Sequence, residues 1–251
     1  MYDFSPVLPL IHLHANAEAP RESCGLVVKR SDGSLLYVPC RNTADERDLF
    51  RLDPSDAARA EDQGELVAYA HSHVYTPPIP TDADRYSMHK SGLPWIIVNV
   101  PTGAFTVNQP EPFIAPLEGR AFVYGVHDCY GIVRDYYAVK LGITLADYPR
   151  MWGWWENFEL PDMYRENFAS EGFVSVHEGA LDADALKKLK PHDLILFRIR
   201  SRRDNHAAVY VGDGFMLHHL IDEISRRDLL DDFYQKRARA ILRHQSLIDS
   251  E

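Results

Sequence analysis

The sequence of 251 residues has little of three features that would assign it to a specialised class of protein. It holds three cysteines, an odd number without the spacing of a disulfide framework, so reduced thiols are expected instead of a disulfide-stapled secreted domain. It lacks any apolar run approaching the roughly 20 residues that cross a bilayer, so no membrane partner is expected. Basic residues number 27 against 37 acidic ones, for a net charge of −10, so no nucleic-acid partner is expected.

What is present is the composition of a folded globular protein. Hydrophobic residues make up 45% and charged residues 25%, which excludes a disordered or fibrous chain. At roughly 150 residues per domain, the length suits one large domain or two compact ones. Residues 1–13 lack a basic segment followed by an apolar run, so no secretory signal is expected and the protein should be made in the cytoplasm.

The N-terminal part alternates short strands with helix. Strands are expected at residues 25–29 and 34–38, on either side of an Asp32-Gly33 turn. Pro54 is a good first helical residue, and the helix should run to about Gly64. Two further strands, at 66–70 and 95–100, predict an α/β-like domain over residues 1–108.

A proline-rich stretch separates this part from the rest of the chain. Residues 101–119 include Pro101, Pro110, Pro112 and Pro116 without sustained periodicity, and we place a linker at 109–119. After it, a helix is expected at 128–139 and strands at 194–199 and 207–211. Residues 120–251 are therefore predicted to form a second domain, and the fold class of the whole chain is predicted to be α+β.

The strand at 66–70 runs directly into His71-Ser72-His73. Residues two apart in a strand face the same side of a sheet, so both imidazoles can reach one ion. A stiff loop leads from there to Asp84, whose carboxylate would complete three ligands and leave a fourth position for water, as catalytic zinc requires. In the alternative interpretation, the histidines only end a strand and Glu22 forms a surface ion pair.

The spacing of His71, His73, Thr81 and Asp84, with Glu22 upstream, resembles the motif of the JAMM-type metalloproteases. The resemblance covers roughly residues 1–105 and implies a zinc ion (Zn2+) held by His71, His73 and Asp84. It assigns to Glu22 the removal of a proton from the attacking water. Thr81 stands where the family has serine, so an oxyanion-binding hydroxyl is kept while a methyl group is added.

Cys129 lies at the expected start of the helix at 128–139, with Asp128 as its N-cap. A thiol in the first turn of a helix faces unpaired backbone N–H groups, which favours the thiolate. An isolated cysteine is more often a buried core residue, so the position of Cys129 alone does not make it a nucleophile.

Together with Asn205-His206 and the strand that follows, Asp128-Cys129 resembles the NlpC-type cell-wall cysteine peptidases over about residues 118–245. The resemblance implies a papain-like domain in which Cys129 is the nucleophile and His206 the general base. His218, twelve residues later, would orient His206, and His219 is the alternative. The implied substrate is a peptidoglycan stem peptide, cut between γ-D-glutamate and diaminopimelate.

A metallopeptidase-like domain followed by an NlpC-like domain resembles a family of tail proteins of lambda-like phages. This implies phage tail tip proteins as partners, assembly in the host cytoplasm, and action from the tail tip in the host periplasm. Two functions stay open. The chain is a tail peptidase, with cysteine-type hydrolysis and zinc-dependent peptide or isopeptide hydrolysis, or it is a structural assembly factor that binds partners through exposed aromatics such as Trp152 and Trp154.

Overall fold

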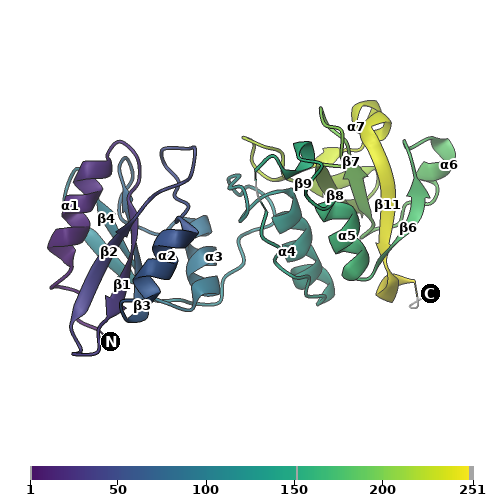
Figure 1. The fold of residues 1–251 in the computed structure, drawn as a ribbon. Helices are drawn as coiled ribbons and strands as arrows, with labels where there is room; N and C mark the ends of the chain where they lie inside the picture. Colours follow the sequence, from purple (N-terminus) through teal and green to yellow (C-terminus); the bar gives the residue numbers. More distant parts are fainter. Residues whose placement is uncertain (1, 151, 249–251) are drawn as a thin grey trace. The chain divides into compact units, whose positions relative to one another are not determined.

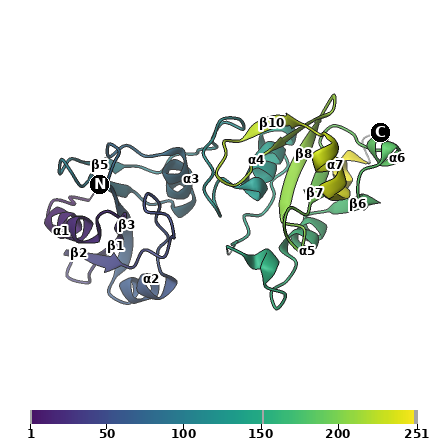
Figure 2. The same cartoon turned by 90° about the horizontal axis from the view of Figure 1, so that it is seen from above.

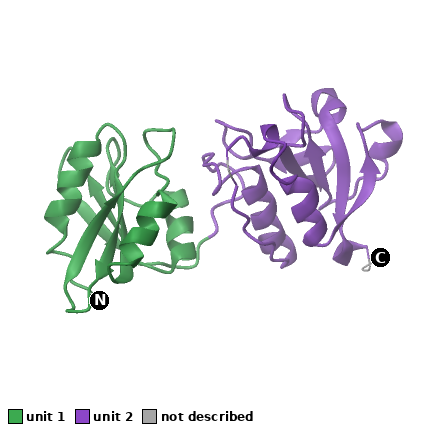
Figure 3. Cartoon of the chain, viewed as in Figure 1, with its two compact units in different colours: residues 1–113 green, residues 114–251 purple. Residues whose placement is uncertain are grey.

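The computed structural model describes residues 2–150 and 152–248, and it divides into two compact units between residues 113 and 114 (Figure 3). Each unit combines one sheet with helices, which confirms the α+β fold class. Within the described residues, no helix has both the length and the apolar character needed to span a membrane.

The first unit is built on a five-stranded sheet in the order β2-β1-β3-β4-β5 (Figure 1). Strands β3 and β4 run parallel, and the other neighbouring pairs are antiparallel. The elements are α1 (Leu8–Glu18), β1 (Cys24–Lys29), β2 (Leu35–Cys40), α2 (Pro54–Glu61), β3 (Glu65–His73), α3 (Asp82–Ser91), β4 (Trp95–Asn99) and β5 (Phe105–Asn108).

Side chains along β1 alternate between the two faces of this sheet, and a different helix covers each face. Val27 packs with α1, whereas Leu26 and Val28 pack with α2 on the opposite face. The four predicted strands and the helix opening at Pro54 are confirmed, although that helix ends at Glu61. The sequence pattern does not predict α1, since its buried residues are only Ile11 and Ala15 and its apolar stripe is correspondingly thin.

The second unit is built on a six-stranded antiparallel sheet in the order β10-β9-β8-β7-β11-β6. Figure 2 labels β10, β8, β7 and β6 of this sheet. Helices α4 and α5 cover one face, and α6 and α7 pack on the other. The elements are α4 (Cys129–Leu141), η1 (Trp154–Glu156), α5 (Met163–Ser170), β6 (Phe173–Glu178), α6 (Ala183–Leu186), β7 (Leu194–Phe197), β8 (His206–Gly212), β9 (Phe215–His218), β10 (Arg226–Leu229), α7 (Asp232–Arg237), β11 (Ala238–His244) and η2 (Gln245–Leu247).

The ends of α4 follow from local chemistry. The side chain of Asp128 accepts a hydrogen bond from Gly131 N at 2.8 Å, and Gly142 ends the helix with a φ of 68°. This confirms the helix expected at 128–139 and places Cys129 at its first position. The strand expected at 207–211 is β8, which begins one residue earlier, at His206.

Candidate functional site

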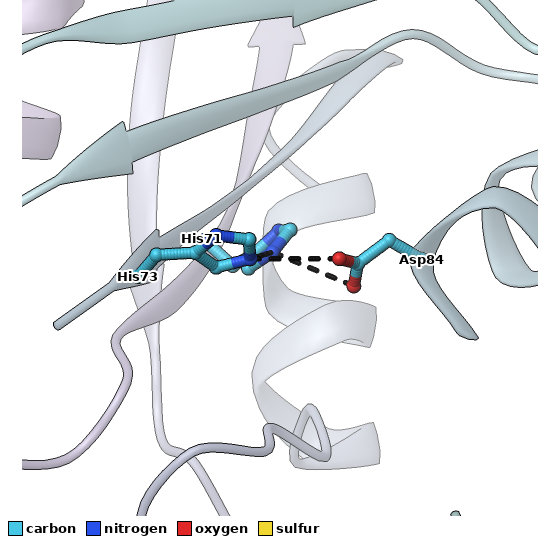
Figure 4. A group of neighbouring side chains, drawn as sticks. All are labelled: His71, His73 and Asp84. Carbon is cyan, nitrogen blue, oxygen red and sulfur yellow. Dashed lines mark hydrogen bonds and ion pairs between the residues drawn. The ribbon is translucent and has the colours of Figure 1, made fainter. Parts of the chain in front are cut away.

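The first unit gathers two histidines and a carboxylate at the end of β3 and the start of α3 (Figure 4). The Nε2 atoms of His71 and His73 lie 3.1 Å apart. The two oxygens of Asp84 divide between them, with Oδ1 3.5 Å from His71 Nε2 and Oδ2 3.5 Å from His73 Nε2. All three side chains are buried.

These separations fit a zinc ion. Zinc bonds of about 2.0 to 2.1 Å in a tetrahedron place neighbouring ligand atoms roughly 3.3 Å apart. The two Nε2 atoms lie 3.1 Å apart, and each lies 3.5 Å from a different oxygen of Asp84, so these separations are close to that value. Two imidazole nitrogens and one carboxylate oxygen also form a donor set that zinc prefers, so the residues present fit the ion that the sequence predicts.

Surrounding groups fix the orientation of the candidate ligands. His73 Nδ1 donates to the carbonyl of Pro77 at 2.7 Å, which fixes the ring so that Nε2 is the nitrogen directed at the cluster. The backbone N–H and the hydroxyl of Thr81 each donate to Asp84 Oδ2 at 2.8 Å, and Asp84 N donates back to Thr81 Oγ1. This capping box starts α3 and aims the carboxylate. The oxyanion role predicted for Thr81 requires its hydroxyl to turn away from Asp84, and it stays a prediction.

The cluster is enclosed by aromatic rings and by the predicted base. Phe50 stacks on His71 with ring centroids 4.7 Å apart. Trp95 contacts the ring of His71 edge-on, with ring centroids 5.4 Å apart. Glu22 is 7% exposed. Burial raises the pKa of Glu22 to about 7, and the nearby His71 and His73 limit that rise. A carboxyl group with this pKa can both accept and return a proton near neutral pH.

The second unit gathers its predicted site residues where α4 begins beside β8 and β9. Cys129 Sγ lies 2.8 Å from the hydroxyl of Tyr164, on α5. His206 Nε2 lies 3.0 Å from His218 Nδ1, so the two predicted histidines are in contact. His219 turns elsewhere, with Nε2 3.1 Å from the carbonyl oxygen of Glu223.

Asp228 completes this chain of contacts and determines where the protons lie. Its Oδ2 is 3.1 Å from His218 Nε2. Burial raises the pKa of Asp228, but hydrogen bonds from His218 and Arg226 outweigh it and lower the pKa, so the carboxylate only accepts. His218 therefore donates from Nε2 to Asp228 and accepts at Nδ1 from His206 Nε2–H. This leaves His206 Nδ1 as the nitrogen that can take a proton.

The protonation state of the thiol differs from the one that its helix position predicts. Burial, and then the negative charge of Asp128, raise the pKa of Cys129 to about 11. Burial also holds the pKa of His206 well below its usual value. The helix N-terminus alone favours a thiolate, but desolvation outweighs it. The cysteine and histidine therefore rest uncharged at neutral pH.

Three functional candidates are missing from the sequence-based prediction. Tyr164 lies on a different helix from Cys129, and Asp228 is on an edge strand whose pairing with β9 the sequence does not reveal. Arg150, buried in a loop, donates from Nε to Asp128 at 2.7 Å. No short-range spacing marks any of them, because their partners are brought close only by the tertiary fold.

Comparison with known proteins assigns each of the two units to a separate domain family. Residues 4–109 match the family described as prokaryotic homologs of the JAB domain, and residues 119–243 match the NlpC/P60 family. Across both regions, the chain is 34% identical to tail tip assembly protein K of Escherichia phage N15, covering 96% of this chain and 95% of that protein.

The chain belongs to the tail tip assembly protein K family. The phage lambda member of the family is 35% identical over 78% of this chain and 90% of its own length. The JAB-like unit is also similar to a desampylase of Pyrococcus furiosus, at 30% identity over 83 residues, or 31% of this chain and 59% of that protein. The K-family relatives thus align with the two units in sequence, whereas the desampylase aligns with part of the chain.

Proposed function

We propose that this K-family protein acts in phage tail tip assembly and carries two peptidase sites, one in each unit. The cysteine site would hydrolyse peptidoglycan stem peptides at the bond between γ-D-glutamate and diaminopimelate. The observation that carries this proposal is the chain of contacts from His206 through His218 to Asp228, at 3.0 and 3.1 Å, beside the N-terminus of α4. Such a chain presents one unprotonated nitrogen of His206, as a general base requires.

The proposed reaction at the cysteine site has two stages. His206 Nδ1 takes the thiol proton of Cys129, and Sγ attacks the scissile carbonyl carbon. Collapse of the tetrahedral intermediate breaks the C–N bond, and His206 gives its proton to the leaving amine. Water then attacks the thioester with His206 again as base, which releases the acid and restores the thiol.

Three further side chains support these steps without entering the covalent chemistry. The Tyr164 hydroxyl, 2.8 Å from Sγ, would donate to the sulfur as its negative charge develops. Burial keeps the pKa of Tyr164 well above its usual value, so its proton stays available. His218 and Asp228 hold the ring of His206 and stabilise its protonated form.

The metal site would hydrolyse a peptide or isopeptide bond in a partner protein or in the wall. Zinc, when bound by His71, His73 and Asp84, supplies Lewis acidity that polarises a substrate carbonyl and acidifies a water molecule. Glu22, which is buried and interacts with His71 and His73, would take the proton of the attacking water and return it to the leaving amine. Thr81 keeps Asp84 aimed at the metal through the capping box.

The test is mass spectrometry of the fragments released from purified peptidoglycan. The wild-type protein is compared with Cys129→Ala, which removes the thiol, and with Glu22→Gln, which removes only the proposed base of the other site. We expect the wild-type and Glu22→Gln proteins to release peptides that begin with diaminopimelate, leaving γ-D-glutamate on the glycan, and Cys129→Ala to release none. Release by Cys129→Ala would refute the assignment of the cysteine site.

Assembly is tested with the same variants in the phage. If the protein acts only as a structural assembly factor, Cys129→Ala and Glu22→Gln should both yield normal numbers of infectious particles. If either peptidase site is needed, the corresponding variant should produce tails that fail in assembly or in infection while the protein itself remains folded.

A further inference from the structure

A group of aromatic rings surrounds the exposed Trp152, with two members in the loop between α4 and α5 and one that precedes α4. Gly153, with a φ of 73°, bends the chain so that Trp152 and Trp154 take different environments. Trp152 is 50% exposed, whereas Trp154 is 2% exposed and belongs to the core, which corrects the expectation that both are surface residues. The ring of Trp152 contacts those of Tyr124 and Trp155 at centroid distances of 5.0 and 5.4 Å. We call Tyr124, Trp152 and Trp155 the aromatic platform.

A series of ring contacts connects this platform to the reactive thiol. Trp155 contacts Trp154 at 6.1 Å, and Trp154 contacts Tyr164 at 5.3 Å. The hydroxyl of Tyr164 is in turn 2.8 Å from Cys129 Sγ. The platform is therefore continuous with the proposed catalytic site through packed side chains.

Both ends of the loop are tied to the segments that carry the catalytic residues. Before the platform, Arg150 donates to Asp128 at 2.7 Å, next to Cys129. After it, the guanidinium of Arg203 donates to the carbonyls of Leu160 and Pro161 at 2.7 and 3.1 Å. Arg203 precedes His206 by three residues. These hydrogen bonds anchor residues on either side of the platform to the segments that carry Cys129 and His206.

We propose that the aromatic platform is a subsite for the sugar rings of the wall glycan to which the stem peptide is attached. The inference rests on the proposed function of the cysteine site and names the part of the polymer that this surface takes. Aromatic faces pack well against the uncharged, apolar face of a pyranose ring.

Charge argues against the peptide as the occupant of the platform. The stem peptide is rich in carboxylates, and the exposed Glu156 and Glu159 follow the platform in the same loop. A ligand that is neutral at this point avoids repulsion from these two side chains. The sugar is the neutral part of the polymer, so the geometry places the peptide toward Cys129 and the glycan toward Trp152.

The test measures binding of two probes with the same charge, a disaccharide-tetrapeptide and the same tetrapeptide with an N-acetyl group in place of the sugar. Isothermal titration on the Cys129→Ala protein prevents cleavage during the measurement. We expect the sugar-bearing probe to bind about two- to tenfold more tightly, as one aromatic stacking contact would give. Trp152→Ala in that background should abolish the difference, and Trp152→Phe should retain part of it.

The matched control is Phe105→Ala, which removes an aromatic ring that is 46% exposed in the other unit and should retain the full difference. Equal affinity for the two probes would overturn the subsite, and so would an equal loss for both probes in Trp152→Ala. Hydrolysis of both probes by the wild-type protein is followed separately. Tighter binding of the sugar-bearing probe without hydrolysis would refute the proposed peptidase while leaving the subsite standing.

Discussion

Replacing Tyr164 by phenylalanine removes a single oxygen, and this oxygen is the one 2.8 Å from Cys129 Sγ. The ring is 4% exposed and packs against Trp154 and Phe168, so Tyr164→Phe keeps these contacts. The hydroxyl lowers the pKa of Cys129 by donating to the thiolate. Its loss must therefore raise the pKa of the thiol.

The size of this effect follows from the strength of one hydrogen bond to a charged group. Such a bond contributes about 1.5 to 3 kcal/mol, which corresponds to a rise of about one to two pKa units. Each unit lowers the thiolate fraction about tenfold at neutral pH, while the intrinsic nucleophilicity of the thiolate rises with a slope of about 0.4 to 0.5. The net expectation is a reaction with a disulfide reagent that is about 3- to 16-fold slower.

The assay follows the reaction of 2,2′-dithiodipyridine with the protein as a function of pH, without any substrate. Cys24 and Cys40 are buried free thiols, so the Cys129→Ala protein gives the background rate. We expect the rate for Tyr164→Phe to be lower throughout the neutral range and its titration to move to higher pH. An unchanged rate and an unchanged titration would refute the role of Tyr164 in stabilising the thiolate.

Three other substitutions test separate parts of the structure. Asp228→Asn removes the negative charge that orients His218. The kcat for stem-peptide hydrolysis should fall about tenfold or more with KM unchanged, and an unchanged kcat would contradict the orienting role of Asp228. Arg150→Met leaves the buried Asp128 without this ionic partner. Urea denaturation should show a free energy of unfolding lower by about 3 to 5 kcal/mol, and a decrease below about 1 kcal/mol would argue against a stabilising ion pair. Thr81→Val removes the hydroxyl that orients Asp84, a proposed zinc ligand. Competition with a chelator should then show an affinity for zinc about 10- to 100-fold weaker, and equal affinity would contradict the orienting role.

The parts of the fold that sequence predicts are those fixed by local rules. The strand that ends in His71-Ser72-His73 and the helix capped by Asp128 depend on two-residue alternation and on N-cap chemistry, both of which operate within a few residues. The helix at 8–18 escapes prediction because few of its side chains are buried, so that its apolar pattern is faint.

The residues of the candidate sites also fall into two groups, those that local sequence predicts and those that depend on the tertiary fold. Residues with a recognisable spacing, such as His71 and His73, can be proposed from the sequence. Tyr164 and Asp228 cannot, because their positions depend on how α5 packs against α4 and on which strand pairs with β9. The pKa of Cys129 depends on burial, which the position of a cysteine at a helix N-terminus does not reveal.

The most direct test of two separate hydrolytic sites is cleavage of a synthetic L-alanyl-γ-D-glutamyl-diaminopimelate peptide in the presence and absence of a zinc chelator. We expect the same kcat/KM for the wild-type protein in both conditions, and no measurable cleavage by Cys129→Ala or His206→Ala. Cleavage that disappears with the chelator and persists in Cys129→Ala would contradict it, since the metal site would then be the one that cuts the stem peptide.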